Sequence, residues 1–421
     1  MKANATEERR RTRMRSEKIL KLNDIKTRNM LSLLGLLLEH ESLSRIELAR
    51  KMNCDNATVT RAVRDLLGRG LLVSSGRTEL RHGRPRELLS VNPDGRYIIG
   101  IALAPDGITG VMTDLRGRIK VREQAFFLPA RRTRELFLVT LEKITSRLLQ
   151  SAGDRLAGVG VSTFGAGMGV MQNDIANFPE LNGLNLQDFF LGKFQLSPEF
   201  SDMMICRMYY ELIRHRESRN GSVLFLSAGK GIGMAAAIDG KIVFSRKRHG
   251  GELGHNICEP DGLPCACGRR GCLETRCSSQ AILQEAKKRF RRPAMTFHEF
   301  ADLYRNQDPR AADIVEKAVR FLAVALANLL NNLAPDSLIF SGELSGLGEN
   351  FLNSLEKSIR SLLFPFAEKE LSFVRRDLND ECDAVGAALL VTAKLLSDPE
   401  EFEKSCPHLQ DVIPDGAEPR E

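Results

Sequence analysis

The strongest constraint on the fold is a cluster of sulfur and imidazole side chains beyond the middle of the chain. Cys265, Cys267 and Cys272 fall within eight positions with glycines between them, and His255 lies ten positions upstream. Three thiolates and one imidazole suit a closed tetrahedral zinc ion. Unrelated cysteines or a disulfide are the alternatives, and the tight, glycine-rich spacing argues against both. The pattern predicts a loop folded around a structural Zn2+, with no position open for a catalytic water.

The bulk composition indicates a soluble protein of two or three domains. The chain has 421 residues, of which 43% are hydrophobic and 27% charged. Residues 1–29 are polar and basic and do not resemble a signal peptide. The most apolar run, residues 318–333, is interrupted by arginine and asparagine, so it predicts a buried helix and no membrane insertion. Nine cysteines without a disulfide framework are typical of the cytoplasm, where we expect the protein to reside.

The basic residues are concentrated at the amino terminus. Residues 1–90 contain 20 Lys and Arg against 11 Asp and Glu, whereas the whole chain carries a net charge of only +7. A localised basic excess is typical of nucleic-acid binding. A solvated basic tail, residues 1–28, accounts for only the first part of this excess.

A helix-turn-helix pattern follows the basic tail. Residues 29–41 form a leucine-rich helical run, and Ser44 with Glu47 forms a capping box for a second short helix. Asn56 is placed to cap a third helix that ends near Gly70. Two short strands, residues 71–74 and 86–91, flank a basic hairpin tip. The pattern over 29–92 predicts a winged helix-turn-helix that binds DNA, and a small helical domain for protein contacts is the alternative.

Helical spacing divides the side chains of the third helix between two faces. Val59, Val63, Leu66 and Leu67 are expected to point inward. The polar residues of the opposite face and of the wing suit base-edge and phosphate contacts. The expected DNA-binding residues are Asn56, Thr58, Thr60, Arg61, Arg64, Arg77 and Arg84.

The metal-binding run also resembles a family signature. Gly-Glu-Leu-Gly-His at 251–255, followed by Cys-x-Cys-Gly-x-x-Gly-Cys-Leu-Glu at 265–274, resembles the signature of the ROK family of sugar-responsive repressors and sugar kinases. The resemblance covers nearly the whole chain up to about residue 395. It implies an α/β (or α+β) fold in which residues 96–395 form a two-lobed, actin-like ATPase domain with a sugar cleft. Residues 396–421 are expected to form a tail.

The loops that hold ATP in kinases of this fold are altered here. The resemblance implies an Asp-x-Gly-Gly-Thr loop after the first strand, where this chain has Ala102 and Pro105. It implies Gly-Thr-Gly-Ile-Gly on the facing lobe, where Lys230 replaces the threonine. A later Gly-Gly corresponds to Gly342 followed by Glu343. Loss of these groups removes the expected contacts to magnesium and phosphate.

The catalytic base of such kinases has two candidate positions here. Counting back from Glu211 places Met203 at the base position, whereas a shift of one residue places Asp202 there. The sequence leaves these two alternatives open.

The resemblance implies that the sugar-binding groups are better preserved. Glu252 and His255 are three residues apart and are expected on one face of a helix, and Glu274 ends the metal loop. Asn177 resembles an asparagine that contacts sugar in the family. Carboxylates, an imidazole and an amide can hydrogen-bond vicinal hydroxyls. A cap at Glu252 and a salt bridge at Glu274 are the purely structural alternatives.

These observations predict a non-enzymatic transcription factor, most simply a repressor. Its partners would be operator DNA and a sugar or sugar-phosphate effector. It would act as a homodimer or a dimer of dimers on a palindromic operator. The alternatives are a sugar kinase with an attached DNA-binding head and a DNA-bound scaffold that responds to a protein partner.

Overall fold

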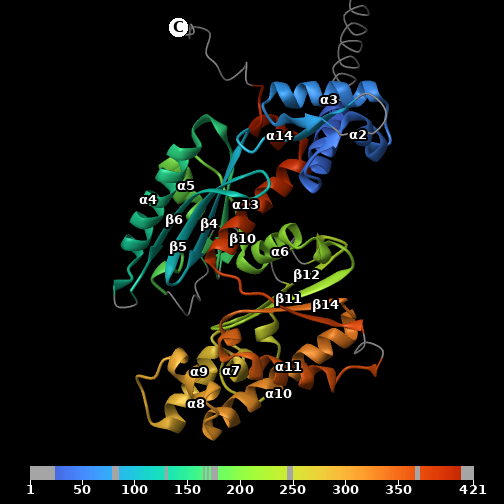
Figure 1. Ribbon diagram of the computed structural model, residues 1–421. Coiled ribbons are helices and arrows are strands. Elements are labelled where there is room, and N and C mark those ends of the chain that lie inside the picture. The colour runs from blue at the N-terminus through green and yellow to red at the C-terminus, as the bar shows by residue number, and fades with distance from the viewer. Residues whose placement is uncertain are drawn as a thin grey trace, which may run out of the picture.

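The protein consists of an amino-terminal head and two larger lobes (Figure 1). The computed structural model describes residues 24–77, 85–128, 131–164, 166–167, 170–171, 179–243, 250–365 and 370–408. None of the helices among these residues has the length and apolar character needed to cross a membrane.

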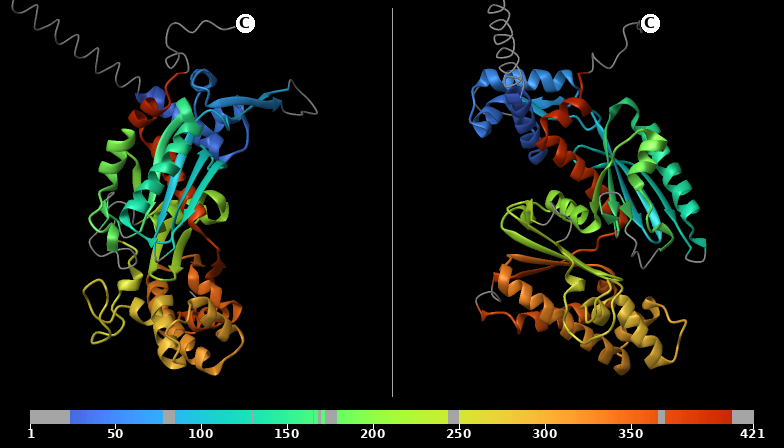
Figure 2. Two further views of the ribbon diagram at one scale, coloured as in Figure 1. Left: turned by 90° about the vertical axis from the view of Figure 1, so that its left-hand side faces the viewer. Right: turned by 180° about the vertical axis from the view of Figure 1, so that it is seen from behind.

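The head is a winged helix-turn-helix, as the sequence predicts. Its helices span residues 24–39, Arg45–Met52 (α2) and Asn56–Gly68 (α3). Its strands are Leu43–Ser44 (β1), Leu72–Arg77 (β2) and Glu87–Val91 (β3), and they form an antiparallel sheet in the order β1-β3-β2. Figure 2 shows the β2–β3 hairpin projecting from the head as a wing.

Local details of the head confirm one predicted cap and correct another. The capping box of Ser44 and Glu47 is present at the start of α2. Asp55, not Asn56, caps α3, because the Asp55 carboxylate accepts a hydrogen bond of 2.7 Å from the N–H of Thr58. Leu67 was expected to point inward but its side chain is 38% exposed. The first helix already includes residue 24, earlier than the predicted start at 29.

The two lobes repeat one sheet topology. The first sheet has the order β10-β7-β4-β5-β6 and the second β13-β12-β11-β14-β15. In each sheet three neighbouring strands are antiparallel (β6-β5-β4 and β13-β12-β11), and two further strands are added in parallel. The duplicated, two-lobed arrangement implied by the resemblance is therefore present.

The first sheet consists of Tyr97–Ala104 (β4), Gly107–Asp114 (β5), Ile119–Phe126 (β6), Leu156–Thr163 (β7) and Glu199–Asp202 (β10). The second consists of Ser222–Ala228 (β11), Ile232–Ile238 (β12), Lys241–Ile242 (β13), Ser337–Ser341 (β14) and Ser372–Arg375 (β15). Ala166–Gly167 (β8) and Val170–Met171 (β9) form a separate pair.

Helices cover both sheets. The first lobe carries Arg134–Ala152 (α4), Leu186–Phe194 (α5) and Asp380–Ser397 (α13). In the second lobe Met203–Arg214 (α6) packs on one sheet face. The opposite side holds Glu274–Cys277 (α7), Ser279–Phe290 (α8), Phe297–Arg305 (α9), Pro309–Leu333 (α10) and Glu349–Arg360 (α11). Helix α10 contains the apolar run at 318–333 that the sequence assigned to a buried helix.

The carboxy-terminal segment packs onto the head. After α13, Pro399–Ser405 forms α14. Phe402 and Cys406 are 1% exposed and belong to the same hydrophobic cluster as the core of the head. The expectation of a tail beginning at residue 396 is therefore wrong for 396–408. The segment carries few apolar residues, and Phe402 is buried in a cluster formed by the head, the first lobe and α13.

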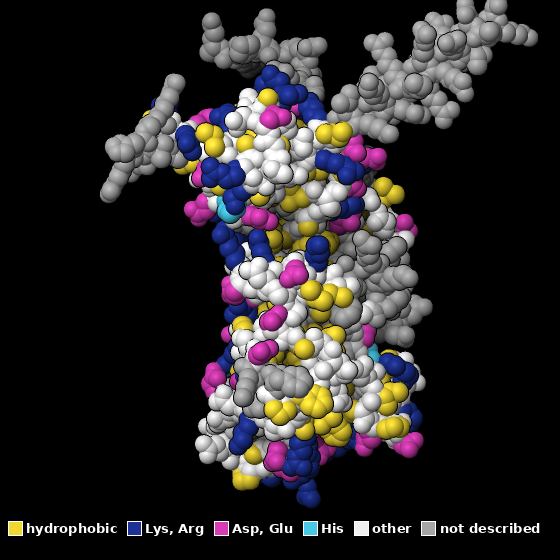
Figure 3. All heavy atoms as spheres, turned by 90° about the vertical axis from the view of Figure 1, so that its right-hand side faces the viewer, with side chains coloured by type: hydrophobic (Ala, Val, Ile, Leu, Met, Phe, Trp, Pro, Cys, Tyr) yellow, Lys and Arg dark blue, Asp and Glu magenta, His cyan; other side chains and the backbone are white. Residues whose placement is uncertain are grey.

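Two arginines from the body bind the end of the first helix of the head. Arg116, in the turn after β5, donates hydrogen bonds of 2.6 and 2.9 Å to the carbonyls of Leu37 and His40. Arg216, from the second lobe, donates one of 2.8 Å to the carbonyl of Glu39. Cations stabilise the unpaired carbonyls at a helix carboxyl end. Figure 3 shows Lys and Arg side chains where the head meets the lobe below it.

The lobes meet where α6 crosses α13. A Cβ atom on Gly386 of α13 would lie only 2.0 Å from the carbonyl oxygen of Cys206 in α6, so the helix backbones are in close contact. Beside it, Arg207 forms a buried ion pair with Asp383, with Nε–Oδ1 and Nη2–Oδ2 distances of 2.7 and 3.0 Å. Arg207 also donates to the Ser227 hydroxyl at 2.8 Å. This contact joins the two lobes.

The close contact at the helix crossing predicts that adding one methyl group at Gly386 destabilises the protein. Gly386→Ala should lower the free energy of unfolding by about 1–3 kcal/mol, because the backbones must move apart. Gly192→Ala is the matched control, since a Cβ there meets no atom within 4 Å at an exposed position of α5, and it should be neutral or slightly stabilising. Urea denaturation followed by circular dichroism would measure both. Equal midpoints for the two variants would contradict the close contact.

Candidate functional site

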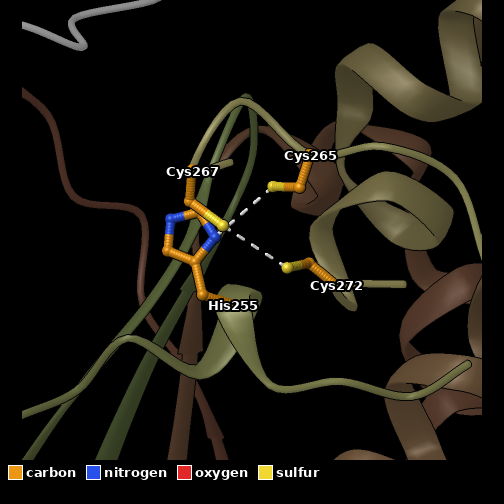
Figure 4. Close-up of side chains that lie close together, drawn as sticks. All are labelled: His255, Cys265, Cys267 and Cys272. Carbon is orange, nitrogen blue, oxygen red and sulfur yellow. Dashed lines mark hydrogen bonds between the residues drawn. The ribbon is translucent and has the colours of Figure 1, made fainter. Parts of the chain in front are cut away.

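The four predicted metal ligands converge on one point (Figure 4). The ligand atoms of His255, Cys265, Cys267 and Cys272 all lie within 4.8 Å of one another. His255 Nδ1 is 3.6 Å from Cys265 Sγ, and the Sγ atoms of Cys267 and Cys272 are also 3.6 Å apart. Ligands about 2.3 Å from a tetrahedral zinc ion would be separated by roughly 3.7 Å. The group therefore has the composition and the size of a tetrahedral metal site.

Local backbone geometry explains why this loop closes. Gly268 and Gly271 have φ angles of +83° and +72°, which residues with a side chain rarely adopt. His255 ends a short 3₁₀ helix, Leu253–His255, rather than the α-helix that we expected. Burial opposes ionisation of Cys267, but hydrogen bonds from Arg269 and from the thiols of Cys265 and Cys272 outweigh it and lower its pKa to about 6. Burial raises the pKa of Cys265 and Cys272, so the apo cluster favours one thiolate, at Cys267. A thiolate is the form that binds metal.

Glu252 and Glu274 lie beside the metal ligands, and Asp202 interacts electrostatically with Glu252. We call Asp202, Glu252 and Glu274 the carboxylate cluster. Glu252 Oε2 lies 4.0 Å from His255 Nε2, the ring nitrogen that faces away from the thiols. Glu274 accepts a hydrogen bond of 3.2 Å from the N–H of Ile232, and burial raises its pKa. The structure thus brings together three of the four predicted sugar-binding residues. The fourth, Asn177, lies outside the described residues.

Asp202 is the member of the cluster that the sequence left ambiguous. It ends β10 in the first lobe and caps α6, where its carboxylate accepts a hydrogen bond of 2.7 Å from the N–H of Met204. Burial by surrounding protein, together with the nearby charge of Glu252, raises the pKa of Asp202 to about 6 although its side chain retains access to solvent. Met203 instead packs against the apolar core under α6. Of the two candidates, Asp202 therefore contributes the carboxylate near Glu252. Because Asp202 belongs to the first lobe and Glu252 to the second, the cluster spans both lobes.

The altered nucleotide loops face each other across the lobes. Ala102 is buried in β4. Lys230, in the turn after β11, lies 3.9 Å from the Asp106 carboxylate in the turn after β4. The Ser279 hydroxyl donates to the Glu343 carboxylate, and a Cβ on Gly229 would lie 3.2 Å from Glu343 Cβ. Acidic side chains thus lie beside both loops, where the kinase resemblance implies phosphates.

Most of the predicted DNA-binding residues are exposed on α3 or at the start of the wing. Thr60, Arg61 and Arg64 are exposed along α3, and no ion pair to a described residue engages either arginine. Asn56 is exposed at the first position of the helix, whereas Thr58 is half-buried and bound to Asp55. Arg77 is exposed at the end of β2, where the wing begins. Arg84 lies outside the described residues.

Sequence reasoning missed Asp380, which lies at the start of α13 near the altered loops. Burial and the charges of Asp383 and Asp106 raise its pKa to about 6. Acidic residues are common in the first turn of helices because they stabilise the helix amino terminus. The sequence therefore does not indicate that Asp380 lies between the lobes.

Comparisons with known proteins agree with this geometry. The model of the ROK family matches residues 98–394, and that of the MarR family matches residues 26–79. The chain is 24% identical over 377 residues to a xylose repressor of Bacillus spizizenii, covering 88% of this chain and 97% of that protein.

Two solved structures share the fold. One is a ROK family transcriptional regulator described as a homologue of the E. coli MLC protein, with a TM-score of 0.75, 21% identity and coverage of 91% and 99% of the two chains. The other is a ROK family glucokinase from Streptomyces griseus in complex with glucose and AMPPNP. Its TM-score is 0.57 with 21% identity, and the match covers 70% of this chain and 98% of that one.

Proposed function

Since the chain belongs to the ROK family, we propose that it is a DNA-binding transcriptional repressor whose affinity for its operator is set by a small carbohydrate. The observation that carries the proposal is the joining of a winged-helix head to two lobes that keep a carboxylate cluster but have altered nucleotide loops. The full-length relationship to a xylose repressor supports it.

DNA binding is assigned to α3 and the wing. In this role Asn56, Thr58, Thr60, Arg61 and Arg64 face the major groove, and Arg77 and Arg84 contact the adjacent backbone. The exposed arginines of α3 support this assignment, because a guanidinium can read guanine or neutralise phosphate. The basic excess of residues 1–90 strengthens attraction to DNA.

The effector is assigned to the carboxylate cluster. Glu252, Glu274 and Asp202 offer acceptors from both lobes, and Asn177 completes the set in our proposal. A ligand held by groups from two lobes favours one lobe arrangement over another, and this difference in affinity is the energy available for regulation. The effector is a sugar or a sugar derivative.

A sugar kinase with a DNA-binding head is the second candidate function. Asp202 favours it, because a carboxylate with a pKa raised to about 6 is suited to general base catalysis. Against it, Ala102 replaces the magnesium-binding aspartate, and the acidic Asp106 and Glu343 lie beside the loops that would hold phosphate. Phosphoryl transfer depends on positive groups there. We therefore propose that the protein has no kinase activity.

The metal is proposed to be structural zinc. When bound, Zn2+ would cross-link the loop and leave no coordination position for chemistry. Cys272 is two residues from Glu274, and His255 lies beside Glu252, so the ligands also fix the positions of two cluster carboxylates.

The assembly and location follow from DNA recognition. Helix-turn-helix proteins usually read palindromic operators as dimers, so we propose a homodimer, or a dimer of dimers, in the cytoplasm.

Zinc content tests the metal proposal. Protein purified without added metal should contain about one zinc per chain, and a Cys265→Ser/Cys267→Ser variant should contain about none and melt at a lower temperature. Cys54→Ser is the control for zinc content, since this thiol lies in the head, away from the metal loop. A metal-free double variant with an unchanged melting temperature would show that the site has no structural role.

Operator binding tests the head. Arg61→Ala and Arg64→Ala should each weaken binding by about 1–3 kcal/mol if the arginine reads a base, whereas Arg320→Ala, at an exposed side chain of α10, should have no effect. Fluorescence anisotropy at several salt concentrations would measure this, and affinity should fall steeply with salt. The assignment would be wrong if a fragment lacking residues 1–90 bound the operator as tightly as the full chain.

Calorimetry and an ATP-consumption assay together test the cluster. D-xylose, D-glucose and their phosphates form the first panel, and the best ligand should lose binding in Glu252→Ala and in Glu274→Ala but not in Glu316→Ala, an exposed carboxylate on α10. ATP consumption with that ligand should stay at background. Turnover of about one per second would instead establish the kinase alternative.

A further inference from the structure

Arg69 is a buried arginine at the end of the recognition helix α3. It is the C-cap residue of α3 and only 5% exposed, so its guanidinium is not free to reach DNA. Its stem is part of the head, but its charged end points into the carboxy-terminal segment. A buried guanidinium is costly unless its donors are paired, so the groups that Arg69 binds in that segment determine where its side chain can lie.

Among the described residues, the polar partners of the Arg69 guanidinium come from one remote segment and engage its two terminal nitrogens, whereas the buried Nε has none. Nη1 donates to the Cys406 carbonyl at 2.5 Å, and Nη2 pairs with Glu403 Oε2 at 2.6 Å. The guanidinium carbon also lies 5.4 Å from the ring centroid of Phe402. These residues are more than 330 positions away in sequence and lie on α14 or directly after it.

Other contacts hold the same segment in place. The second oxygen of Glu403 accepts a hydrogen bond of 2.7 Å from the Thr27 hydroxyl, so this carboxylate joins the first helix of the head to α3. Arg96, buried just before β4, donates to the Pro407 carbonyl at 2.9 Å. The segment is therefore bound both to the head and to the first lobe.

The segment is also continuous with the helix at the lobe crossing. Helix α13 begins with Asp380 and Asp383 between the lobes and, over about 27 Å, leads into α14. Figure 2 shows α13 and α14 running from the lobe junction to the head. The carboxyl end of α3 is thus fastened to an element of the body and not only to the rest of the head.

We propose that Arg69 is a positioning residue for DNA recognition, which sets the orientation of α3 by binding residues 399–408. The proposal rests on the DNA-binding function above. In it, the DNA-reading unit comprises the winged helix together with α14, and Arg69 acts without touching DNA.

The test compares Arg69→Met and Glu403→Ala in the full-length protein. The probes are a duplex selected from random-sequence DNA by the wild-type protein and a scrambled duplex of the same length. Arg69→Met keeps an apolar stem, and Glu403 is 43% exposed, so the second variant remains informative if the first does not fold. Arg360→Met is the matched control, because Arg360 binds Glu356 and a backbone carbonyl in the second lobe.

We expect both variants to lose at least about ten-fold in affinity for the selected duplex, while the double variant loses little more than Arg69→Met alone. Binding to the scrambled duplex and the dependence of affinity on salt should not change, because no phosphate contact is removed. Arg69→Lys should recover part of the loss through Glu403, and Arg360→Met should bind as the wild type does.

Three results would overturn the inference. The first is an affinity within two-fold of wild type in folded Glu403→Ala. The second is a loss in Arg69→Met that comes with a salt dependence reduced by about one phosphate contact, which would make Arg69 a direct DNA ligand. The third is a wild-type protein that enriches no sequence, which would overturn the proposed function and this inference with it.

Discussion

The arrangement of the whole molecule depends on the packing of α13. Cβ atoms on Gly100 of β4 and Gly160 of β7 would lie 1.9 and 2.1 Å from carbonyl oxygens of this helix, so it rests directly on the first sheet. Gly386 gives the same close contact with α6 of the second lobe. Because backbones in contact leave no room for side chains to rearrange, α13 has a fixed position in both lobes. Helix α14 follows α13 and packs against the head, so the position of the head depends on that of α13.

Two ion pairs between the lobes differ in strength, and the difference indicates how the lobes can move. Arg207 and Asp383 are 9% and 3% exposed, and removing one partner of such a buried pair costs about 3–5 kcal/mol. Lys230 and Asp106 are both more than half exposed and 3.9 Å apart, so their pair contributes at most about 1 kcal/mol. The lobes are therefore firmly joined at the α6–α13 crossing and weakly joined at the altered loops.

The features that the sequence predicted depend on residues close together in the chain. The metal loop, the capping box at Ser44 and the helices and strands of the head are specified by spacing over three to about twenty residues. Exposure of Leu67, burial of Phe402 and the position of Asp202 depend on partners that are distant in sequence. A polar stretch with a single phenylalanine carries no periodicity, so the packing of α14 could not be predicted without the tertiary fold.

In the proposed function, one chain binds both DNA and a carbohydrate, and the binding of each ligand changes the affinity for the other. The most direct measurement is the affinity of the full-length protein for its selected duplex, with and without a saturating concentration of the sugar that binds most tightly. Linkage through the lobes predicts a change of five-fold or more, and an equal change in sugar affinity when the duplex is bound. Identical affinities in the presence and absence of the sugar would contradict the account.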